Sequence, residues 1–338
     1  MHHDDVSLHN VAELADAPDA DGRVFQRVPE TTRAELNEGA RANYRRPAGA
    51  EIRFVTEETV EVTLSAPEHP CEVRPYWGPF QGRESFEIGT EPTTVALSTP
   101  DRVDEIREEV AAEYPVHPRV CRLVLPHRSK PVAYHGVNGD RRPPRAEELP
   151  DDTLVAYGTS ITRGIAATAP HLTYVAQTAR RLGTDALNLG TAGSAFCEPE
   201  IADHIAARDD WDAATLALSV NMVAGFSVPE FRERVSYVVE TVAAENPEKP
   251  VVAITLFPYF AELCAGDQGD HENFEAYREA LREAVAAADR GNLHLVEGGD
   301  LLPRGRGLTA DVLHPGDDAM IDIGVALAEE LGGLVGSD

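Results

Sequence analysis

The feature that most constrains the fold is a change in hydrophobic periodicity near residue 150. Beyond it, apolar runs of strand length alternate with longer segments whose apolar residues recur at helical spacing. The runs cover residues 153–157, 186–189, 215–220, 251–257 and 293–296, and the helical segments cover 172–182, 198–207, 229–245, 274–289 and 316–331. Such alternation predicts a parallel sheet covered on both faces, with ligands bound at the carboxyl ends of its strands. We therefore expect an α/β domain over residues 151–338.

The preceding part of the chain has the pattern of a β domain. Short segments rich in β-branched and aromatic residues cover residues 52–56, 59–65, 71–77, 85–88, 93–98, 119–125 and 132–135. Within them, Val60, Val62 and Leu64 alternate with polar residues, as in half-buried strands. This pattern predicts an all-β sandwich of jelly-roll type over residues 49–137, interrupted by one helix at 103–113.

Two polar stretches complete the predicted organisation. Residues 1–48 contain few apolar clusters, and we expect a loosely structured N-terminal arm with one strand. Residues 138–150 are rich in Pro, Gly and charged residues, which is typical of a linker between domains.

The charge balance restricts the partners. Asp and Glu number 58 against 30 Lys and Arg, for a formal net charge of −28. Such a chain repels nucleic acid and anionic membrane surfaces. Acidic residues spread through the sequence suggest a halophilic protein in a high-salt cytoplasm, and the first residues lack the pattern of a secretory signal. The four cysteines have no CxxC spacing, so we expect no cysteine-bound metal.

Two motifs could supply nucleophilic catalysis. Gly158-Thr159-Ser160-Ile161-Thr162 directly follows the first predicted strand, where a serine in a tight turn presents its hydroxyl over the sheet edge. The simpler interpretation is that Ser160 only caps a helix. Asp311-Val312-Leu313-His314-Pro315 precedes the last helix, and its spacing lets Asp311 fix the tautomer of His314, which then serves as a base.

Two further segments could supply hydrogen-bond donors at the same sheet edge. Residues 188–194 hold Gly190 and Gly193, where the backbone N–H can approach a ligand closely, and Asn221 follows the third strand with its side-chain amide. Acyl transfer needs such donors for the oxyanion. Each could instead be structural, as a turn glycine or a helix cap.

In this order the four motifs resemble those of the SGNH (GDSL-type) hydrolases. Gly158 to Thr162 resembles the family's first block, with Thr159 where Asp is usual. Gly193 and Asn221 match the second and third blocks, although Met222 follows Asn221 where the family usually has Asp. Asp311 to Pro315 matches the last block without change.

The resemblance implies a fold and a mechanism. The fold would be a flavodoxin-like, three-layer parallel-sheet domain after a β-sandwich, an arrangement similar to some carbohydrate esterases. Ser160 would be the nucleophile, His314 the base and Asp311 its orienting partner. Gly193, Asn221 and the Ser160 N–H would hold the oxyanion, and neither metal nor organic cofactor would be needed.

Aromatic and apolar residues beside these motifs are candidates for a substrate pocket. Phe196, Met222, Phe226 and Tyr259 follow strand ends and could line an acyl or alcohol site, or simply pack in the core. Arg163 could bind an acidic substrate group, or form a surface salt bridge.

The sequence therefore predicts a serine esterase whose substrate is a small acyl ester, such as an acylated sugar. Two alternatives remain open: a non-catalytic carbohydrate-binding protein with a vestigial site, and an acyltransferase that delivers the acyl group to a sugar.

Overall fold

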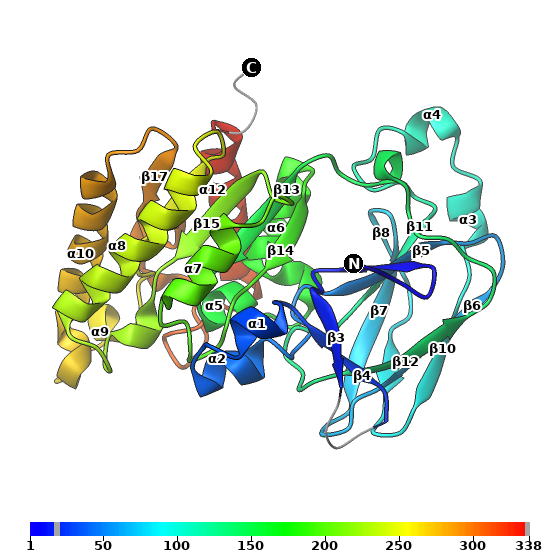
Figure 1. Cartoon of the computed structure of the whole chain (residues 1–338), viewed down its shortest axis with the longest axis horizontal. Coiled ribbons are helices and arrows are strands. Elements are labelled where there is room, and N and C mark those ends of the chain that lie inside the picture. The colour runs from blue at the N-terminus through cyan, green and yellow to red at the C-terminus, as the bar shows by residue number, and fades with distance from the viewer. Residues whose placement is uncertain (17–20, 335–338) are drawn as a thin grey trace. The chain divides into compact units, whose positions relative to one another are not determined.

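The computed structural model describes residues 1–16 and 21–334 (Figure 1). Residues 17–20 of the predicted arm and 335–338 of the predicted α/β domain lie outside this range. The chain divides into two compact units. The first holds the described residues of Met1–Glu30 with Tyr44–Asp151 and Gly183–Leu187. The second holds Thr31–Asn43, Asp152–Leu182 and the described residues from Asn188 onward.

The first unit is a β-sandwich, as predicted. One antiparallel sheet has the order β1-β2-β5-β11-β7-β8, with β9 also paired to β7. Its strands are β1 (His2–His3), β2 (Val6–His9), β5 (Glu51–Val55), β7 (Cys71–Trp77), β8 (Phe80–Gln81), β9 (Phe86–Ile88) and β11 (Val120–Val124). The other sheet has the order β10-β6-β12-β4-β3. Its strands are β3 (Glu13–Asp16), β4 (Arg23–Gln26), β6 (Val60–Ser65), β10 (Thr93–Leu97) and β12 (Ala133–Asn138).

Alternating residues of the two sheets form the core of the sandwich. Ile52 and Phe54 of β5 and Val62 and Leu64 of β6 are all 0% exposed and belong to one apolar cluster. Because successive side chains in a strand point to opposite faces, the residue between Ile52 and Phe54 faces away from this core.

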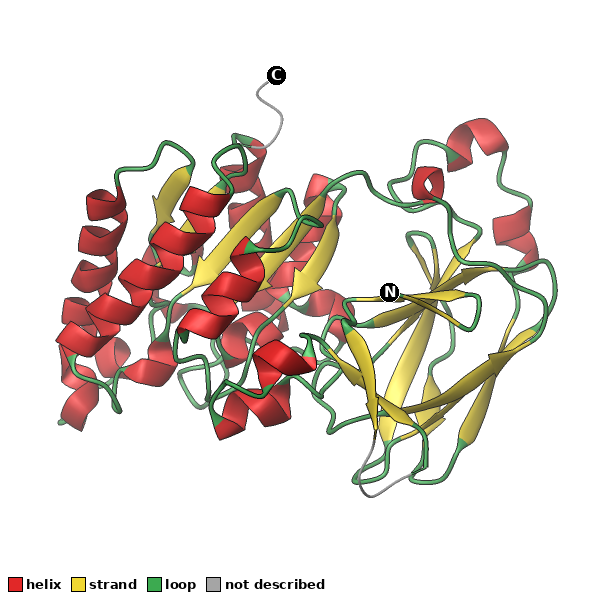
Figure 2. Cartoon of the chain, viewed as in Figure 1, coloured by secondary structure: helices red, strands yellow, loops and turns green. Residues whose placement is uncertain are grey.

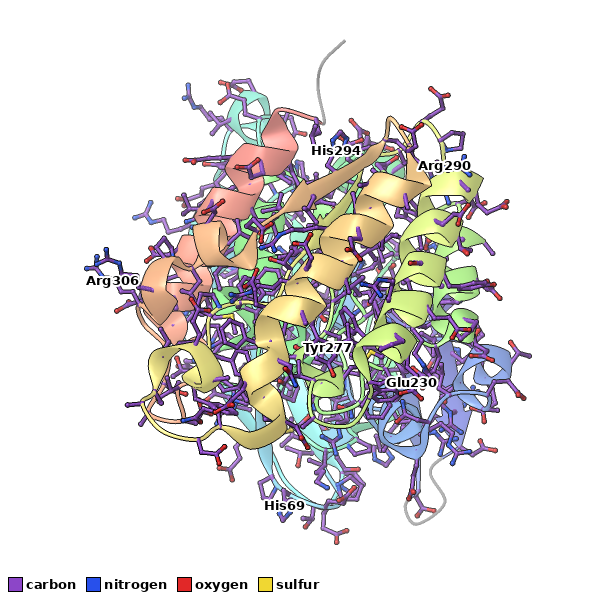
Figure 3. The ribbon with its side chains drawn as sticks, turned by 90° about the vertical axis from the view of Figure 1, so that its left-hand side faces the viewer. His69, Glu230, Tyr277, Arg290, His294 and Arg306 are labelled. Atoms are coloured by element: carbon purple, nitrogen blue, oxygen red, sulfur yellow. The ribbon has the colours of Figure 1, made fainter. Side chains whose placement is uncertain are left out.

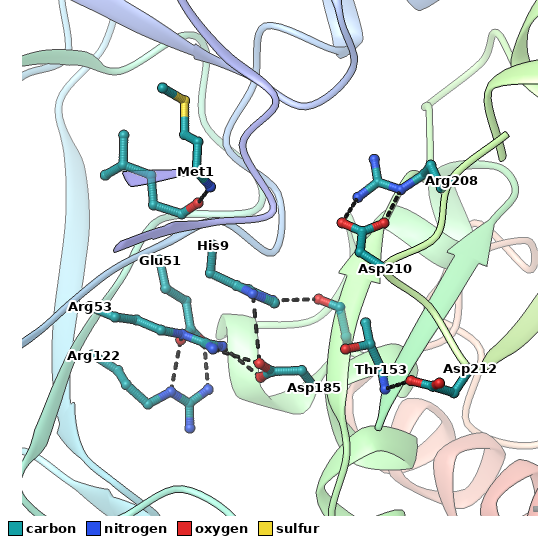
Figure 4. Close-up of polar contacts among 12 residues, drawn as sticks. Met1, His9, Glu51, Arg53, Arg122, Thr153, Asp185, Arg208, Asp210 and Asp212 are labelled. Carbon is teal, nitrogen blue, oxygen red and sulfur yellow. Dashed lines mark hydrogen bonds and ion pairs between the residues drawn. The ribbon is translucent and has the colours of Figure 1, made fainter. Parts of the chain in front are cut away.

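Arg53 is that residue, and it lies in a buried ionic cluster (Figure 4). Its guanidinium donates to Glu51 Oε2 at 2.8 Å and to both oxygens of Asp185 at 2.7 Å, while being only 2% exposed. Arg122 of β11 also donates to Glu51, at 2.7 and 2.5 Å. The buried charges on this face are thus paired and hydrogen-bonded, as buried ions must be.

Residues 1–48 correct the expectation of a loose arm. They hold four strands distributed over both sheets, and Val6, Leu8 and Phe25 are completely buried in the sandwich core. The residues from Glu30 onward form α1 (Glu30–Arg33) and α2 (Glu38–Asn43), and Thr31–Asn43 belongs to the second unit.

Two other expectations for this region differ from the structure. The helix expected at 103–113 is two single turns, α3 (Asp101–Asp104) and α4 (Glu108–Ala111), because Arg107 between them has an extended backbone. The stretch expected as a linker is part of the first unit: Arg142 forms a backbone bridge to Val55 and a bidentate pair with Glu148 at 2.6 and 2.7 Å, next to a 3-10 turn at Ala146–Glu148.

The second unit is a three-layer α/β domain (Figure 2). Its sheet has the order β14-β13-β15-β16-β17, which is the flavodoxin-like order. The strands are β13 (Thr153–Tyr157), β14 (Asp185–Asn188), β15 (Ala213–Ala217), β16 (Val251–Ile254) and β17 (Leu293–Val296), and the division between the units falls within β14. The registered pairs β13–β15, β15–β16 and β16–β17 are all parallel. This confirms the predicted fold class.

Helices cover both faces of this sheet. α6 (Tyr174–Leu182) packs against α12 (Asp317–Gly332), whereas α7 (Pro199–Ala206), α8 (Val228–Glu245) and α10 (Phe274–Ala288) pack in sequence on the other side. Three shorter helices that follow strands of this sheet are single turns: α5 (Ser160–Arg163), α9 (Phe260–Leu263) and α11 (Gly298–Leu301). Ser227 and Glu230 form a capping box that starts α8 (Figure 3). Among the described residues, none of the helices has the length and apolar character needed to cross a bilayer.

Candidate active site

Ser160 is the first residue of α5 and directly follows the tight turn that connects β13 to this helix. Gly158 allows this turn, since a side chain there would collide with Thr162 and come within 2.9 Å of the Ala217 carbonyl oxygen on β15. The N-cap of α5 is Thr159, whose hydroxyl accepts from the Ile161 N–H at 3.3 Å. The helix-capping role considered for Ser160 therefore belongs to its neighbour, and the Ser160 hydroxyl is available for another partner.

That partner is His314. Ser160 Oγ lies 2.9 Å from His314 Nε2, and His314 Nδ1 lies 2.7 Å from Asp311 Oδ2. The three side chains thus form a continuous hydrogen-bonded chain, although Ser160 and His314 are 154 residues apart. The imidazole can accept the serine proton only when its own proton is on Nδ1, facing Asp311.

The loop from Leu308 to Pro315 fixes this geometry. Its ends pair as an antiparallel bridge, and Thr309 N–H donates to the His314 carbonyl at 2.8 Å. Val312 has φ +52°, a left-handed conformation that is unfavourable for a β-branched residue. This turn brings Asp311 Oδ1 within 2.9 Å of the backbone N–H groups of both Leu313 and His314.

The pKa of Asp311 reflects these contacts. Partial burial acts to raise it, but hydrogen bonds from the His314 N–H, the His314 ring, the Leu313 N–H and the Thr309 hydroxyl lower the pKa well below its usual value. The carboxylate therefore stays charged opposite the imidazole.

The loop after β14 lies against the Ser160 turn. Gly190 permits this contact, because a Cβ there would approach Thr162 C and Arg163 Cα within 2.9 Å. Asn188 holds the two segments together by donating to the Thr162 carbonyl at 2.8 Å and accepting from the Gly190 N–H at 2.9 Å. Gly193, farther along, is exposed and has φ +66°, which explains why glycine suits this position.

Asn221 lies in the 3-10 turn Val220–Met222 that follows β15. Its Oδ1 accepts from the Ala195 N–H at 3.2 Å, so its amide NH₂ is left to point elsewhere as a donor. Tyr277 of α10 (Figure 3) steadies the end of the same loop, because its hydroxyl lies within hydrogen-bond distance of two of its carbonyls, that of Val223 at 3.0 Å and that of Phe226. The contact with Ala195 links Asn221 to the Gly193 loop without the neighbouring Asp of the usual third block.

The match to a family model decides the family. The model of the GDSL-like lipase/acylhydrolase family matches residues 151–329, more than half of the chain. The chain belongs to this family. It is an ester hydrolase by this membership, which argues against the non-catalytic carbohydrate-binding alternative. No curated protein matches the sequence.

Solved structures share the fold of the whole chain at low sequence identity. A protein described as a GDSL-like lipase from Bacteroides ovatus is 19% identical, with a TM-score of 0.70 over 98% of this chain and 96% of that one. The salicylyl-acyltransferase SsfX3 of a tetracycline biosynthetic pathway is 16% identical, with a TM-score of 0.76 over the same shares. A family two carbohydrate esterase from Clostridium thermocellum is 14% identical, with a TM-score of 0.59 over 85% of this chain and 92% of that one.

The residues expected to line a substrate pocket of this GDSL-like hydrolase fall into two groups. Phe196 and Phe226 are half-buried and contact each other as a tilted pair with ring centroids 5.1 Å apart, on the two loops that carry Gly193 and Asn221. Met222 is 0% exposed and Tyr259 is 1% exposed, so both pack in the interior. Tyr259 lines a small pocket together with Ile161 and Leu313.

Two residues near the site differ from expectation or were missed. Arg163 does not form the expected surface salt bridge, because it is buried: it is 2% exposed and donates to Asn43 Oδ1 at 2.9 Å. Asn43 lies within residues 1–48, which were expected to form a loose arm. Nothing in its local sequence indicates a role, because Arg163, Ala192 and Ser194, its partners at the site, lie more than a hundred residues away.

Within the described residues, no group of three or more His, Cys, Asp or Glu side chains is arranged to hold a metal ion. The polar groups gathered at Ser160 are instead a hydroxyl, an imidazole, a carboxylate and amide donors. This set can transfer protons and stabilise an oxyanion.

Proposed function

We propose that the chain is a serine esterase that works through an acyl-enzyme on Ser160. The observation that carries this proposal is the hydrogen-bonded chain from Ser160 Oγ through His314 to Asp311, at 2.9 and 2.7 Å. It has the order and the atoms of a Ser-His-Asp triad.

Acylation begins when Ser160 Oγ attacks the ester carbonyl carbon and its proton passes to His314 Nε2. The carbonyl oxygen becomes an oxyanion, held by the N–H of Ser160, the N–H of Gly193 and the amide of Asn221. The intermediate collapses as the C–O bond to the alcohol breaks, and His314 returns the proton to the leaving oxygen. Asp311 stabilises the imidazolium throughout.

Deacylation repeats these steps with water. His314 removes a proton from a water molecule, whose oxygen attacks the acyl carbon of the Ser160 ester. The second tetrahedral intermediate then releases the acid and restores the serine hydroxyl. Each half of the cycle therefore uses the same proton route and the same donors.

For the substrate we propose a small acyl group on an alcohol such as a sugar. The pair Phe196 and Phe226 offers a limited apolar surface beside the donors, which suits a short acyl chain better than a long one. The fold shared with a carbohydrate esterase whose structure holds cellohexaose supports a sugar as the alcohol. We also propose a high-salt cytoplasm as the working environment, from the net charge of −28.

The test is the variant Ser160→Ala with p-nitrophenyl acetate as substrate. We expect kcat to fall by at least about 10³-fold while the protein remains folded. A fluorophosphonate probe should label the wild-type protein on the peptide that contains Ser160 and should leave the variant unlabelled.

Ser227→Ala is a matched control. Ser227 is a true helix cap, so its loss should cost about 1 kcal/mol of stability and leave kcat unchanged. Full activity of Ser160→Ala would overturn the proposed function.

Acyl transfer to a sugar is a second candidate, favoured by the fold shared with a salicylyl-acyltransferase. The acyl-enzyme would then be attacked by a sugar hydroxyl in place of water. Product analysis with and without added glucose or cellobiose separates the two: an acylated sugar formed at the expense of free acid would indicate transfer.

A further inference from the structure

The segment Thr31–Asn43 contacts the loop that carries Gly193. Asn37 donates from Nδ2 to the Ser194 carbonyl at 3.0 Å and to Glu198 Oε1 at 2.6 Å. Gly39 lies so close to this loop that a Cβ on it would be 2.8 Å from the Cβ of Ser194. All of these residues belong to the second unit.

Asn43 makes the most contacts. Its Oδ1 accepts from Arg163 Nη1 at 2.9 Å and from the Ala192 N–H at 3.2 Å. Its Nδ2 lies 3.1 Å from the Ala192 carbonyl and 3.2 Å from Ser194 Oγ, and donates to the Gly39 carbonyl at 2.8 Å. The residue is 5% exposed, so water competes little for these bonds.

These contacts hold both neighbours of Gly193. Gly193 itself is exposed, and apart from its chain neighbours no heavy atom lies within 4 Å of where a Cβ would be, so no packing on that side holds the residue. The Gly193 N–H shares a peptide plane with the Ala192 carbonyl, and Asn43 binds this carbonyl and the Ser194 hydroxyl. Through Arg163, which ends α5, the same side chain also connects this loop to the helix that begins with Ser160.

We propose that Asn43 is a positioning residue for the oxyanion hole, which sets the distance between the Gly193 N–H and Ser160. This inference rests on the proposed function, because it assumes that an oxyanion forms there. Displacing a donor by a fraction of an ångström weakens its bond to the charged oxyanion more than its bond to the neutral carbonyl of the substrate. The loss should therefore appear in catalysis more than in substrate binding.

The test is Asn43→Ala, measured with p-nitrophenyl acetate and with phenylboronic acid, which forms a tetrahedral adduct on a reactive serine. We expect kcat to fall about 10- to 100-fold with KM within about twofold of wild type. The inhibition constant of the boronic acid should rise by a similar factor to the fall in kcat/KM.

Asn246→Ala is the control for general loss of packing. Asn246 is also buried and donates to two backbone carbonyls, of Ala206 and Val242, but it lies at the end of α8 and these two partners belong to α7 and α8. It should lower thermal stability and leave kcat and the boronic acid constant unchanged.

Two outcomes are separable. If Asn43→Ala keeps kcat within twofold of wild type while Ser160→Ala is inactive, the positioning role is overturned and the proposed function stands. If Ser160→Ala is active, the proposed function itself fails. Should Asn43→Ala not fold, Asn43→Asp replaces it: it keeps both acceptor contacts, loses the three donor contacts, and should show the same fall in kcat.

Discussion

Asp311 shows how a few atoms set the chemistry of one residue. Its Oδ1 accepts two backbone N–H groups and the Thr309 hydroxyl, so Oδ2 is left for His314. Its side chain is 50% exposed, yet its pKa is well below the usual value, because local hydrogen bonds outweigh the cost of partial burial. The sequence predicted Asp311 and His314 from their spacing, but the left-handed Val312 that makes the spacing work has no signal in the sequence.

Asp311→Asn should lower kcat by about 10²- to 10⁴-fold. The amide can keep the bonds to Leu313 and His314 but would present an NH₂ group to His314 Nδ1, favouring the tautomer that cannot accept from Ser160.

Because the pKa of Asp311 is lowered, wild-type activity should show no loss from protonation of this group above about pH 4. Steady-state kinetics against pH checks both. Asp317→Asn, which weakens the contacts to Thr168 and removes a charge at the start of α12, should keep full kcat, and equal kcat for both variants would contradict the role of Asp311.

Among the elements, periodicity predicted those that are long or strongly apolar. The strands at 153–157 and 293–296 have the expected bounds, since both are short apolar runs in a parallel sheet. Only one strand was expected where β1 to β4 lie, because each has only two to four residues, and β2 and β4 also pair with partners that are distant in sequence, β5 and β12. The residues of the candidate site divide in the same way. Those in short motifs were predicted from the sequence, whereas Asn43 was not, because its role depends on long-range contacts.

The buried ionic cluster around Arg53 of β5 also depends on how the elements pack, since its members come from separate strands. Arg53→Met should destabilise the protein at pH 7 by about 3–5 kcal/mol, because it leaves Glu51 and Asp185 as buried, poorly compensated carboxylates. Burial acts to raise the pKa of Asp185, but Arg53 and His9 lower it to about 2. A lowered carboxyl pKa contributes stability above the unfolded value near 4, and this contribution is lost as pH falls through 2.

In the variant the same carboxyl would take up a proton more readily, so the difference from wild type should shrink between pH 7 and pH 3. Urea denaturation at pH 7, 5 and 3 measures it. Arg102→Met, which removes a pair on a side chain that is 92% exposed, should cause no measurable change. A destabilisation by Arg53→Met that is constant across this pH range would contradict the electrostatic explanation.

For the whole molecule, the net charge of −28 is the dominant electrostatic property. Repulsion among surface carboxylates opposes the compact state, and salt reduces it as the Debye length falls from about 10 Å at 0.1 M to about 3 Å at 1 M. The individual strands and helices do not need this charge in order to form. The net charge therefore predicts the salt environment of the protein independently of its fold. The melting temperature should therefore rise between 0.1 and 1 M KCl and then level off.

α12 offers a local version of the same test. Exposed Glu329 and Glu330 lie in its last turn, where no basic residue balances the negative end of the helix dipole. Glu329→Gln with Glu330→Gln should raise the melting temperature at 0.1 M KCl and reduce the further gain at 1 M. Asp318→Asn also removes negative charge but lies in the first turn, where a carboxylate is favourable, so it should lower the melting temperature at low salt. Equal melting temperatures of the wild-type protein at all salt concentrations would refute the halophilic proposal, because a screened repulsion of this size must respond to ionic strength.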